Sequence, residues 1–297
     1  MVFLQTHSIT INIKPFFTSS SSASPLVHHP KRFSSATTTI RATTTKMENT
    51  GIEGSNVNDN KRKIFVAGAT GSTGKRIVEQ LLAKGFAVKA GVRAVDKAKT
   101  TFTDNPLLQI VKADVTEGSA KLAEAIGNDA EAVICATGFR PSLDLFTPWK
   151  VDNFGTVNLV DACKKSNVNR FILISSILVN GAAMGQIFNP AYLFLNVFGL
   201  TLIAKLQAEN YIRKSGINYT IIRPGGLKND PPSGNLVMEP EDTLSTGSIS
   251  RDLVAEVAVE ALGHPESSYK VVEIVSRLEA PKRSFEDLFG SIKQCQV

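Results

Sequence analysis

Residues 64–85 read IFVAGATGSTGKRIVEQLLAKG, and this stretch decides the fold. A short apolar run is followed by a glycine-rich turn and then by apolar residues at helical spacing, up to a glycine that fits a helix C-cap. Such a turn lets the backbone approach a pyrophosphate, and the helix start offers free N–H groups. We therefore predict a dinucleotide-binding turn, with a purely structural tight turn as the alternative. Its predicted cofactor contacts are Gly68, Thr70, Gly71, Ser72, Thr73 and Gly74.

Past this stretch the chain keeps exchanging apolar strand-like runs with helix-spaced patterns. Regular exchange of this kind predicts an α/β fold, a doubly wound parallel sheet of the Rossmann type with right-handed crossovers. With no internal repeat and no second core, we predict one domain over residues 61–297 that carries a small C-terminal lobe on the substrate side. The expected strands are 87–92, 108–111, 132–136, 171–174, 219–222 and 271–275, and the expected helices are 119–126, 151–165, 200–215, 251–262 with Ser250 as N-cap, and 284–292.

The end of the second expected strand bears on which nicotinamide cofactor the chain binds. In NAD-selective folds an acidic residue at this place, about twenty positions after the turn, binds the ribose 2′-hydroxyl. Here the place is held by Arg93, and Lys97 lies one helical turn further along. Because a guanidinium pairs well with a 2′-phosphate, we predict NADP with NADPH preferred over NADH. The alternative is that both cations are only solvated surface charges.

Two further strand ends add residues to the predicted cofactor site. Asp114 ends the third strand, where its carboxylate can accept a hydrogen bond from an adenine amino group while Val115 lines the same pocket. A role of Asp114 as N-cap or turn residue is the alternative. The small residues Ala136, Thr137 and Gly138 follow the fourth strand and allow the backbone to pass close to a ribose.

Residues 218–226 read NYTIIRPGG and residues 246–251 read TGSISR. Together with the glycine-rich turn, these motifs resemble the atypical short-chain dehydrogenase/reductases, the NmrA-like NAD(P)-binding Rossmann proteins, over about residues 61–292. The pattern is similar to the NADP-binding domain of the 62-kDa component of the plastid inner-envelope translocon. The resemblance implies that Pro224 and Gly225 border the cofactor. It does not extend to a Pro- and Ser-rich tail, so tail-mediated docking of ferredoxin–NADP reductase is not expected.

In catalytic members of this family, a Ser or Thr after the fifth strand polarises the carbonyl, and a Tyr-x-x-x-Lys pair on the next helix supplies the proton. Ser175 and Ser176 both follow the fifth strand, and Ser176 is the better match, so the resemblance assigns catalytic roles to Ser176 and Lys205. Lys205 would also hold the nicotinamide ribose; the alternative is a solvated helix lysine. The position four before Lys205 is Thr201, an alkyl hydroxyl that cannot replace a phenol. Tyr192 is either a packing aromatic or a residue that reaches back over the site.

Residues 191–203, AYLFLNVFGLTLI, form the most apolar part of the predicted substrate side. In this fold the segment borders the substrate cleft, so we predict a small-molecule apolar substrate. The same stretch could instead rest on a lipid surface, which would mean peripheral association with a membrane or plastoglobule, or it could pack in the core.

Residues 1–47 are rich in Ser and Thr, contain five basic residues and have no acidic one. This composition is typical of a transit peptide, and its prolines favour a chloroplast over a mitochondrial one. We predict a chloroplast transit peptide over 1–47, a linker over 48–60, and a location in the stroma, or on thylakoids or plastoglobules. A plain disordered tail is the alternative.

Once the five basic residues of this segment are left out, 28 of the 33 Lys and Arg remain against 27 Asp and Glu, so the net charge falls from +6 to +1. A chain this close to neutral predicts no nucleic-acid partner. The three cysteines have no metal-type spacing, so no metal site is expected. Two functions remain open: an NADPH-dependent oxidoreductase, or a non-catalytic NADP(H)-binding module that senses redox state or serves as a scaffold at a plastid membrane or lipid surface.

Overall fold

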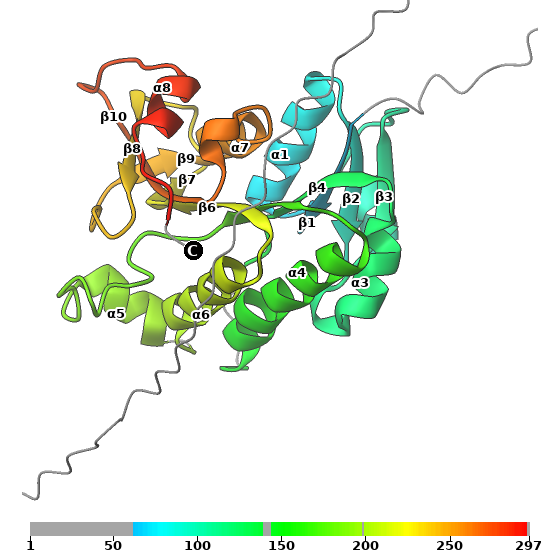
Figure 1. Ribbon diagram of the computed structural model, residues 1–297, viewed down its shortest axis with the longest axis horizontal. Helices are drawn as coiled ribbons and strands as arrows, with labels where there is room; N and C mark the ends of the chain where they lie inside the picture. The colour runs from blue at the N-terminus through cyan, green and yellow to red at the C-terminus, as the bar shows by residue number, and fades with distance from the viewer. Residues whose placement is uncertain (1–61, 139–143, 198, 296–297) are drawn as a thin grey trace, which may run out of the picture. The chain divides into compact units, whose positions relative to one another are not determined.

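A parallel sheet whose strands alternate with helices forms the body of the structure (Figure 1). The computed structural model describes residues 62–138, 144–197 and 199–295, so the predicted transit peptide and linker lie outside the described residues. The strands are β1 (Lys63–Ala67), β2 (Ala87–Val92), β3 (Leu108–Lys112), β4 (Ala130–Cys135), β5 (Arg170–Ile174), β6 (Asn218–Pro224), β8 (Asn235–Pro240) and β10 (Lys270–Arg277).

The order of the strands reverses next to β1. The sheet runs β3-β2-β1-β4-β5-β6-β10-β8, and every neighbouring pair is parallel except β10 with β8. A sheet of this order leaves a crevice outside the carboxyl ends of β1 and β4, where such folds bind ligands. The predicted doubly wound Rossmann fold is therefore confirmed.

Helices cover both faces of this sheet, as Figure 1 shows. On one face Ile64 and Val66 of β1 pack in a core with α1 (Ser72–Ala83), α7 (Arg251–Glu260) and α8 (Phe285–Gly290). On the other face Phe65 and Ala67 pack with α3 (Ser119–Ile126), α4 (Gly155–Lys165) and α6 (Thr201–Lys214). Alternate side chains of one strand thus serve two cores, which is why β1 is apolar throughout.

Local sequence signals account for the ends of two helices. The helix after the glycine-rich turn, α1, buries Ile77, Val78 and Leu81 completely, and Gly85 beyond its end adopts φ +82°, a conformation that favours glycine. Ser250 caps α7, because its Oγ accepts a hydrogen bond from the Leu253 N–H at 3.1 Å. Both signals were read correctly from the sequence.

The structure also contains elements that the sequence patterns did not predict. The predicted helix 151–165 begins earlier, with a π-helical segment η2 (Trp149–Phe154) that runs into α4. The last strand of the sheet, β8, is antiparallel rather than part of a purely parallel array. The other unpredicted elements are α2 (Val95–Lys99), α5 (Pro190–Val197), β7 (Gly226–Lys228), β9 (Ser248–Ser250), and the short 3-10 helices η1 (Val115–Glu117) and η3 (Pro265–Ser267).

Some of these elements form the small lobe beside the sheet. Strands β7 and β9 pair in parallel as a separate two-stranded ribbon. A third apolar cluster joins Tyr192 of α5, Leu202 of α6 and Leu244 to Val275 of β10. The lobe therefore shares β10 with the main sheet and is an extension of the Rossmann domain.

Candidate functional site: a dinucleotide pocket and a buried polar cluster

The glycine-rich turn between β1 and α1 has the close backbone packing that a dinucleotide site requires. Gly68 has φ +74°, and a Cβ on it would lie 2.9 Å from the Ala136 carbonyl oxygen. A Cβ on Gly74 would lie 2.2 Å from the Gly68 carbonyl oxygen, so only glycine lets α1 start so close to the turn. No side chain caps α1 at Gly71, which leaves its first N–H groups available to phosphate oxygens.

A pocket of about 430 Å³ opens beside this turn, at the carboxyl ends of β1 to β4. Its walls combine the turn, the ends of β2, β3 and β4, and the start of η2, so it occupies the crevice expected from the strand order. Glycine backbone, unpaired helix-start N–H groups and a basic side chain together fit a dinucleotide with its phosphates. The lining residues are Gly68, Thr70, Gly71, Gly91, Val92, Arg93, Ala113, Asp114, Val115, Thr116, Ala136, Thr137, Gly138, Thr147, Lys150 and Val151.

The two predicted 2′-phosphate ligands fall in different places. Arg93 follows β2 directly, is exposed, and lines the pocket. Lys97 lies on α2, is also exposed, and is not among the lining residues. Ser72, Thr73 and Gly74 form the first turn of α1 and likewise lie outside the lining, where Gly74 acts by close packing.

Asp114 and Val115 follow β3, the neighbour of β2 in the sheet, and both line the pocket. The Asp114 carboxylate accepts hydrogen bonds from Thr116 N–H at 2.9 Å and from the Thr116 hydroxyl at 2.8 Å, so it caps η1 while it lines the pocket. The N-cap role left open from the sequence is therefore present. Val115 lies against the start of α4, where a Cβ on Gly155 would come within 2.6 Å of a Val115 methyl group.

The end of β4 forms the wall between the two halves of the crevice. Ala136, Thr137 and Gly138 all line the pocket, and the Thr137 hydroxyl lies 3.2 Å from the buried Cys135 Sγ. Burial raises the pKa of the Cys135 thiol, so it behaves as a small neutral core side chain. This arrangement agrees with a backbone that passes close to a bound nucleotide.

Lys205, predicted to be catalytic, pairs with a carboxylate that the sequence reasoning missed. Its Nζ lies 2.7 Å from Oδ1 of Asp152, whose side chain is fully buried. Burial alone would lower the pKa of Lys205, but Asp152 raises it above its ordinary value. The position of Asp152 at the start of the predicted helix 151–165 was the available signal.

The other catalytic candidates are spread over the end of β5 and the start of α6. Ser176 is half-buried after β5, whereas its buried neighbour Ser175 donates a hydrogen bond of 2.5 Å to Glu209. Thr201 is buried at the start of α6, and its hydroxyl has no hydrogen-bond partner among the described residues. Tyr192 packs in the core of the lobe, against Gly181, which supports the packing role.

Pro224 and Gly225, implied by the family resemblance, lie at the carboxyl end of β6. The Pro224 carbonyl accepts a hydrogen bond from Ile177 N–H, and Gly225 N–H donates to Ile274 O at 2.9 Å. Neither lines the pocket described above. They instead connect the chain after β5 to β10.

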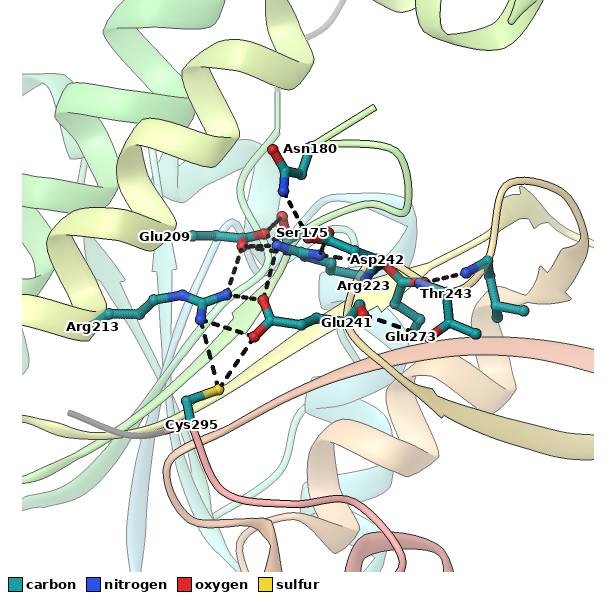
Figure 2. Close-up of polar contacts among 11 residues, drawn as sticks. Ser175, Asn180, Glu209, Arg213, Arg223, Glu241, Asp242, Thr243, Glu273 and Cys295 are labelled. Carbon is teal, nitrogen blue, oxygen red and sulfur yellow. Dashed lines mark hydrogen bonds and ion pairs between the residues drawn. The ribbon is translucent and has the colours of Figure 1, made fainter. Parts of the chain in front are cut away.

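A cluster of buried charges, which the sequence analysis did not identify, lies behind these residues. Figure 2 shows Arg223 of β6 between carboxylates that come from three other segments. Its guanidinium binds Glu209 of α6 at 2.7 Å, Asp242 at 2.7 Å and Glu273 of β10 at 3.3 Å. Burial alone would lower the pKa of Arg223, but Glu209 and Asp242 raise it, so the guanidinium stays charged.

The outer part of this cluster holds the lobe to the sheet. Both oxygens of Glu273 accept backbone N–H groups of residues 242–244, at 2.6 to 3.0 Å. Asn180 donates to Asp242, and Arg213 pairs with Glu241 beside Cys295 (Figure 2). A charged residue inside an otherwise apolar strand, as in Val271-Val272-Glu273-Ile274, was the sequence signal for this network.

The apolar segment 191–203 does not pack as a whole in the core, which was one of its three predicted roles. Leu193, Phe194 and Val197 of α5 are 50%, 66% and 67% exposed, because α5 is a single apolar helix at the surface of the lobe. Gly199, after α5, lies against Leu145, so the exposed side chains of Leu145 and Phe146 adjoin this surface.

Within the described residues, two observations bear on membrane and metal binding. No single helix is long and apolar enough to cross a membrane; α5 and α6 together reach that length and composition but are bent by 86°. Within residues 62–138, 144–197 and 199–295, no three His, Cys, Asp or Glu side chains gather as a metal site.

Comparison with known proteins identifies the relatives of this site. Residues 68–265 match the model of the NAD(P)H-binding family. The chain is 79% identical over 232 residues to "Uncharacterized protein At2g34460, chloroplastic" of Arabidopsis thaliana, covering 78% of this chain and 83% of that one. It is 37% identical over 251 residues to "Protein TIC 62, chloroplastic" of Pisum sativum, covering 77% of this chain but 46% of the pea protein.

A solved structure extends the likeness to the fold. The crystal structure of the oxidoreductase ylbE from Lactococcus lactis superposes with a TM-score of 0.61 at 25% identity, covering 77% of this chain and 95% of that one.

Proposed function

Because this chain belongs to the NAD(P)H-binding family of atypical short-chain dehydrogenase/reductases, we propose that it is an NADPH-dependent oxidoreductase of the chloroplast that reduces an apolar small molecule. Dinucleotide binding follows from family membership and from the pocket at the strand switch. The choice of cofactor, the reaction and the substrate class are the proposal.

The observation that carries the cofactor choice is Arg93 on the wall of the pocket. It follows β2 at the place where an NAD-selective site presents a carboxylate to the ribose. A carboxylate there would repel a 2′-phosphate, whereas a guanidinium attracts it and could bind it through two N–H groups. Lys97, one turn further along, is close enough in sequence to add positive charge without touching the ligand.

Hydride is the chemistry that NADPH supplies when bound, so the chain's own residues have to bind, orient and supply a proton. The residues proposed for this are Ser176 at the end of β5 and Lys205 on α6. The position four residues before Lys205 holds no tyrosine, which argues for a substrate whose reduction depends little on proton donation by a general acid, such as a quinone, a flavin or a conjugated bilin.

The apolar surface of the lobe supports an apolar substrate. Exposed side chains of α5 adjoin Leu145 and Phe146, and Leu145 lies two residues before Thr147 of the pocket. An aromatic or isoprenoid substrate could cover this surface while its reactive group reaches the pocket. The same surface could also rest on a thylakoid or plastoglobule, which flotation of the purified protein with plastid-lipid vesicles would detect.

The plastid location is supported by the composition of residues 1–47 and by the word chloroplastic in the names of both relatives. Import of the labelled chain into isolated chloroplasts, with shortening by cleavage within this segment, tests the proposed transit peptide. A chain that stays outside the organelle and keeps its length would contradict it.

A test of the oxidoreductase follows the loss of NADPH absorbance with quinones, flavins, bilins and unsaturated carbonyls in turn. Turnover with one of these classes, abolished in Gly71→Trp because the indole fills the phosphate turn, supports the proposal. Tight NADPH binding without turnover on any class favours the second candidate, a non-catalytic NADP(H)-binding redox sensor or scaffold. The observation that favours this second candidate is Thr201 in place of the tyrosine.

A further inference from the structure

We propose that Asp152 is a positioning residue that holds Lys205 beside the cofactor pocket as a fixed N–H donor. The inference deepens the oxidoreductase proposed above and rests on it. It assigns a role to a buried carboxylate that neither the cofactor turn nor the two catalytic candidates explain.

The first argument is the way η2 fastens α6. A π-helical segment closes its hydrogen bonds over five residues instead of four, and here two successive side chains of the segment contact the same partner helix. Asp152 Oδ1 lies 2.7 Å from Nζ of Lys205, and Asn153 donates its Nδ2–H to the carbonyl of Ala204 at 3.2 Å. Side chain and backbone of neighbouring α6 residues are thus held by one segment.

The second argument is the distance from this pair to the pocket. A Cβ placed on Gly138, which lines the pocket, would be 3.9 Å from Oδ1 of Asp152. Lys150 and Val151, directly before Asp152, also line the pocket. The pair therefore lies just behind the wall formed by the end of β4.

The position along the crevice indicates which half of the ligand the pair would meet. Arg93 and Asp114 lie at the ends of β2 and β3, on the side where the adenine nucleotide belongs. Lys205 lies on the opposite side of the strand switch, on the helix between β5 and β6. It would therefore meet the nicotinamide nucleotide and the substrate beside it.

The third argument is the charge around the ammonium. Three titratable groups face Lys205: Asp152 from η2, Cys135 from β4 and Glu209 from its own helix. Burial lowers the pKa of Lys205, and Asp152 is the group that does most to raise it above its ordinary value. The pair is neutral as a whole, so its contribution to the ligand is a directed N–H group rather than an attracting charge.

The first measurement follows Lys205 itself, without any cofactor. In protein labelled with carbon-13 at the lysine Cε, the Lys205 signal is identified by its loss in Lys205→Met. We expect it to titrate above the reference value of about 10.4 in the wild type and clearly below that value in Asp152→Asn. A wild-type Lys205 that titrates at or below the reference overturns the proposal, whether or not the variant folds.

The second measurement is NADPH affinity, by calorimetry, at about pH 7.5 and about pH 9.5, because burial without a counter-charge lowers the pKa of a lysine below its reference value of about 10.4. We expect the wild type to bind equally well at both values and Lys205→Met to bind about tenfold more weakly at both. Asp152→Asn should match the wild type at the lower pH and approach Lys205→Met at the higher one. An Asp152→Asn affinity that is as pH-independent as that of the wild type overturns the proposal.

Two further variants separate positioning from simple structural support. In Asp152→Asn/Lys205→Met the pair is replaced by neutral groups, and NADPH affinity should equal that of Lys205→Met alone. A further loss beyond about threefold would mean that Asp152 touches the ligand itself, which contradicts a positioning role. Asp129→Asn is the matched control, because it breaks ion pairs with Lys63 and Lys89 at the opposite ends of the strands and should leave NADPH affinity unchanged.

Failure of the proposed function gives a different result. A wild-type protein that binds no NADPH at either pH would contradict the oxidoreductase, while the Lys205 titration would still show whether Asp152 controls the ammonium.

Discussion

Replacing Glu209 by Gln tests whether the buried charge cluster holds the lobe to the sheet. Glu209 accepts the Ser175 hydroxyl at 2.5 Å and the Arg223 guanidinium at 2.7 to 3.2 Å, and both ionic side chains are buried. Gln at this position has no negative charge, and its N–H₂ group would face the Ser175 and Arg223 donors that Glu209 accepts from. Removing one partner of a buried ion pair costs about 3–5 kcal/mol. Because Asp242 and Glu273 remain on Arg223, we expect the lower end of that range.

A loss of about 3 kcal/mol corresponds to a fall in melting temperature of roughly 6–12 °C for a domain of this size. Urea unfolding followed by far-ultraviolet circular dichroism measures the free energy of unfolding, and calorimetry measures the melting temperature. Glu131→Gln is the control, since its ion pair with Arg62 is exposed and should contribute less than about 1 kcal/mol. A Glu209→Gln loss no larger than that of the control would refute the reasoning.

Three further outcomes follow from the structure. Gly74→Ala should weaken NADPH binding by about a hundredfold or prevent folding, because its Cβ would lie 2.2 Å from the Gly68 carbonyl oxygen; a calorimetric titration with unchanged affinity would contradict this. The Tyr211 hydroxyl donates a hydrogen bond to Asp161 at 2.5 Å, which raises the pKa of Tyr211 to about 12. This hydrogen bond therefore stabilises the fold fully below about pH 10, and its contribution is lost as the pH rises through 12. Tyr211→Phe should therefore cost about 1 kcal/mol at pH 8 and less at pH 11 in urea unfolding, and an equal cost at both would argue against the hydrogen bond. Phe194→Ser should raise KM for an apolar substrate about threefold or more without changing NADPH affinity, because the Phe194 ring is exposed on α5. A variant with the same KM as the wild type would show that α5 does not contact the substrate.

The parts of the fold that the sequence predicted are those with local causes. The strands near β1, the helix α1 and the cap of α7 follow from apolar runs, helical spacing and single capping residues within a few positions. The short strands β7 and β9 were missed because three residues carry no periodicity, and the antiparallel pairing of β8 depends on where the chain returns to β10.

The site residues likewise fall into those that local sequence predicts and those that depend on contacts between distant parts of the chain. The position of Gly68, Gly71 and Arg93 along the pocket could be predicted, because the ends of the first two strands and the turn before the first helix determine it locally. The partners Asp152 and Lys205 are 53 positions apart, and Arg223 is joined to carboxylates on α6, on β10 and before β9, so their contacts exist only in the folded chain. Lys97, predicted from its sign and spacing, sits on the short helix α2 outside the lining.

The most direct measurement is a calorimetric titration of residues 48–297 with NADPH and with NADH, repeated on Arg93→Ala and on the control Lys97→Ala. We predict that the wild type and Lys97→Ala bind NADPH more tightly than NADH, and that Arg93→Ala loses about 10- to 100-fold in NADPH affinity alone, as expected for a charged hydrogen-bonding partner. Equal affinity for the two nucleotides, or an Arg93→Ala protein that keeps the preference, would contradict the NADPH assignment; no binding of either would contradict the oxidoreductase itself.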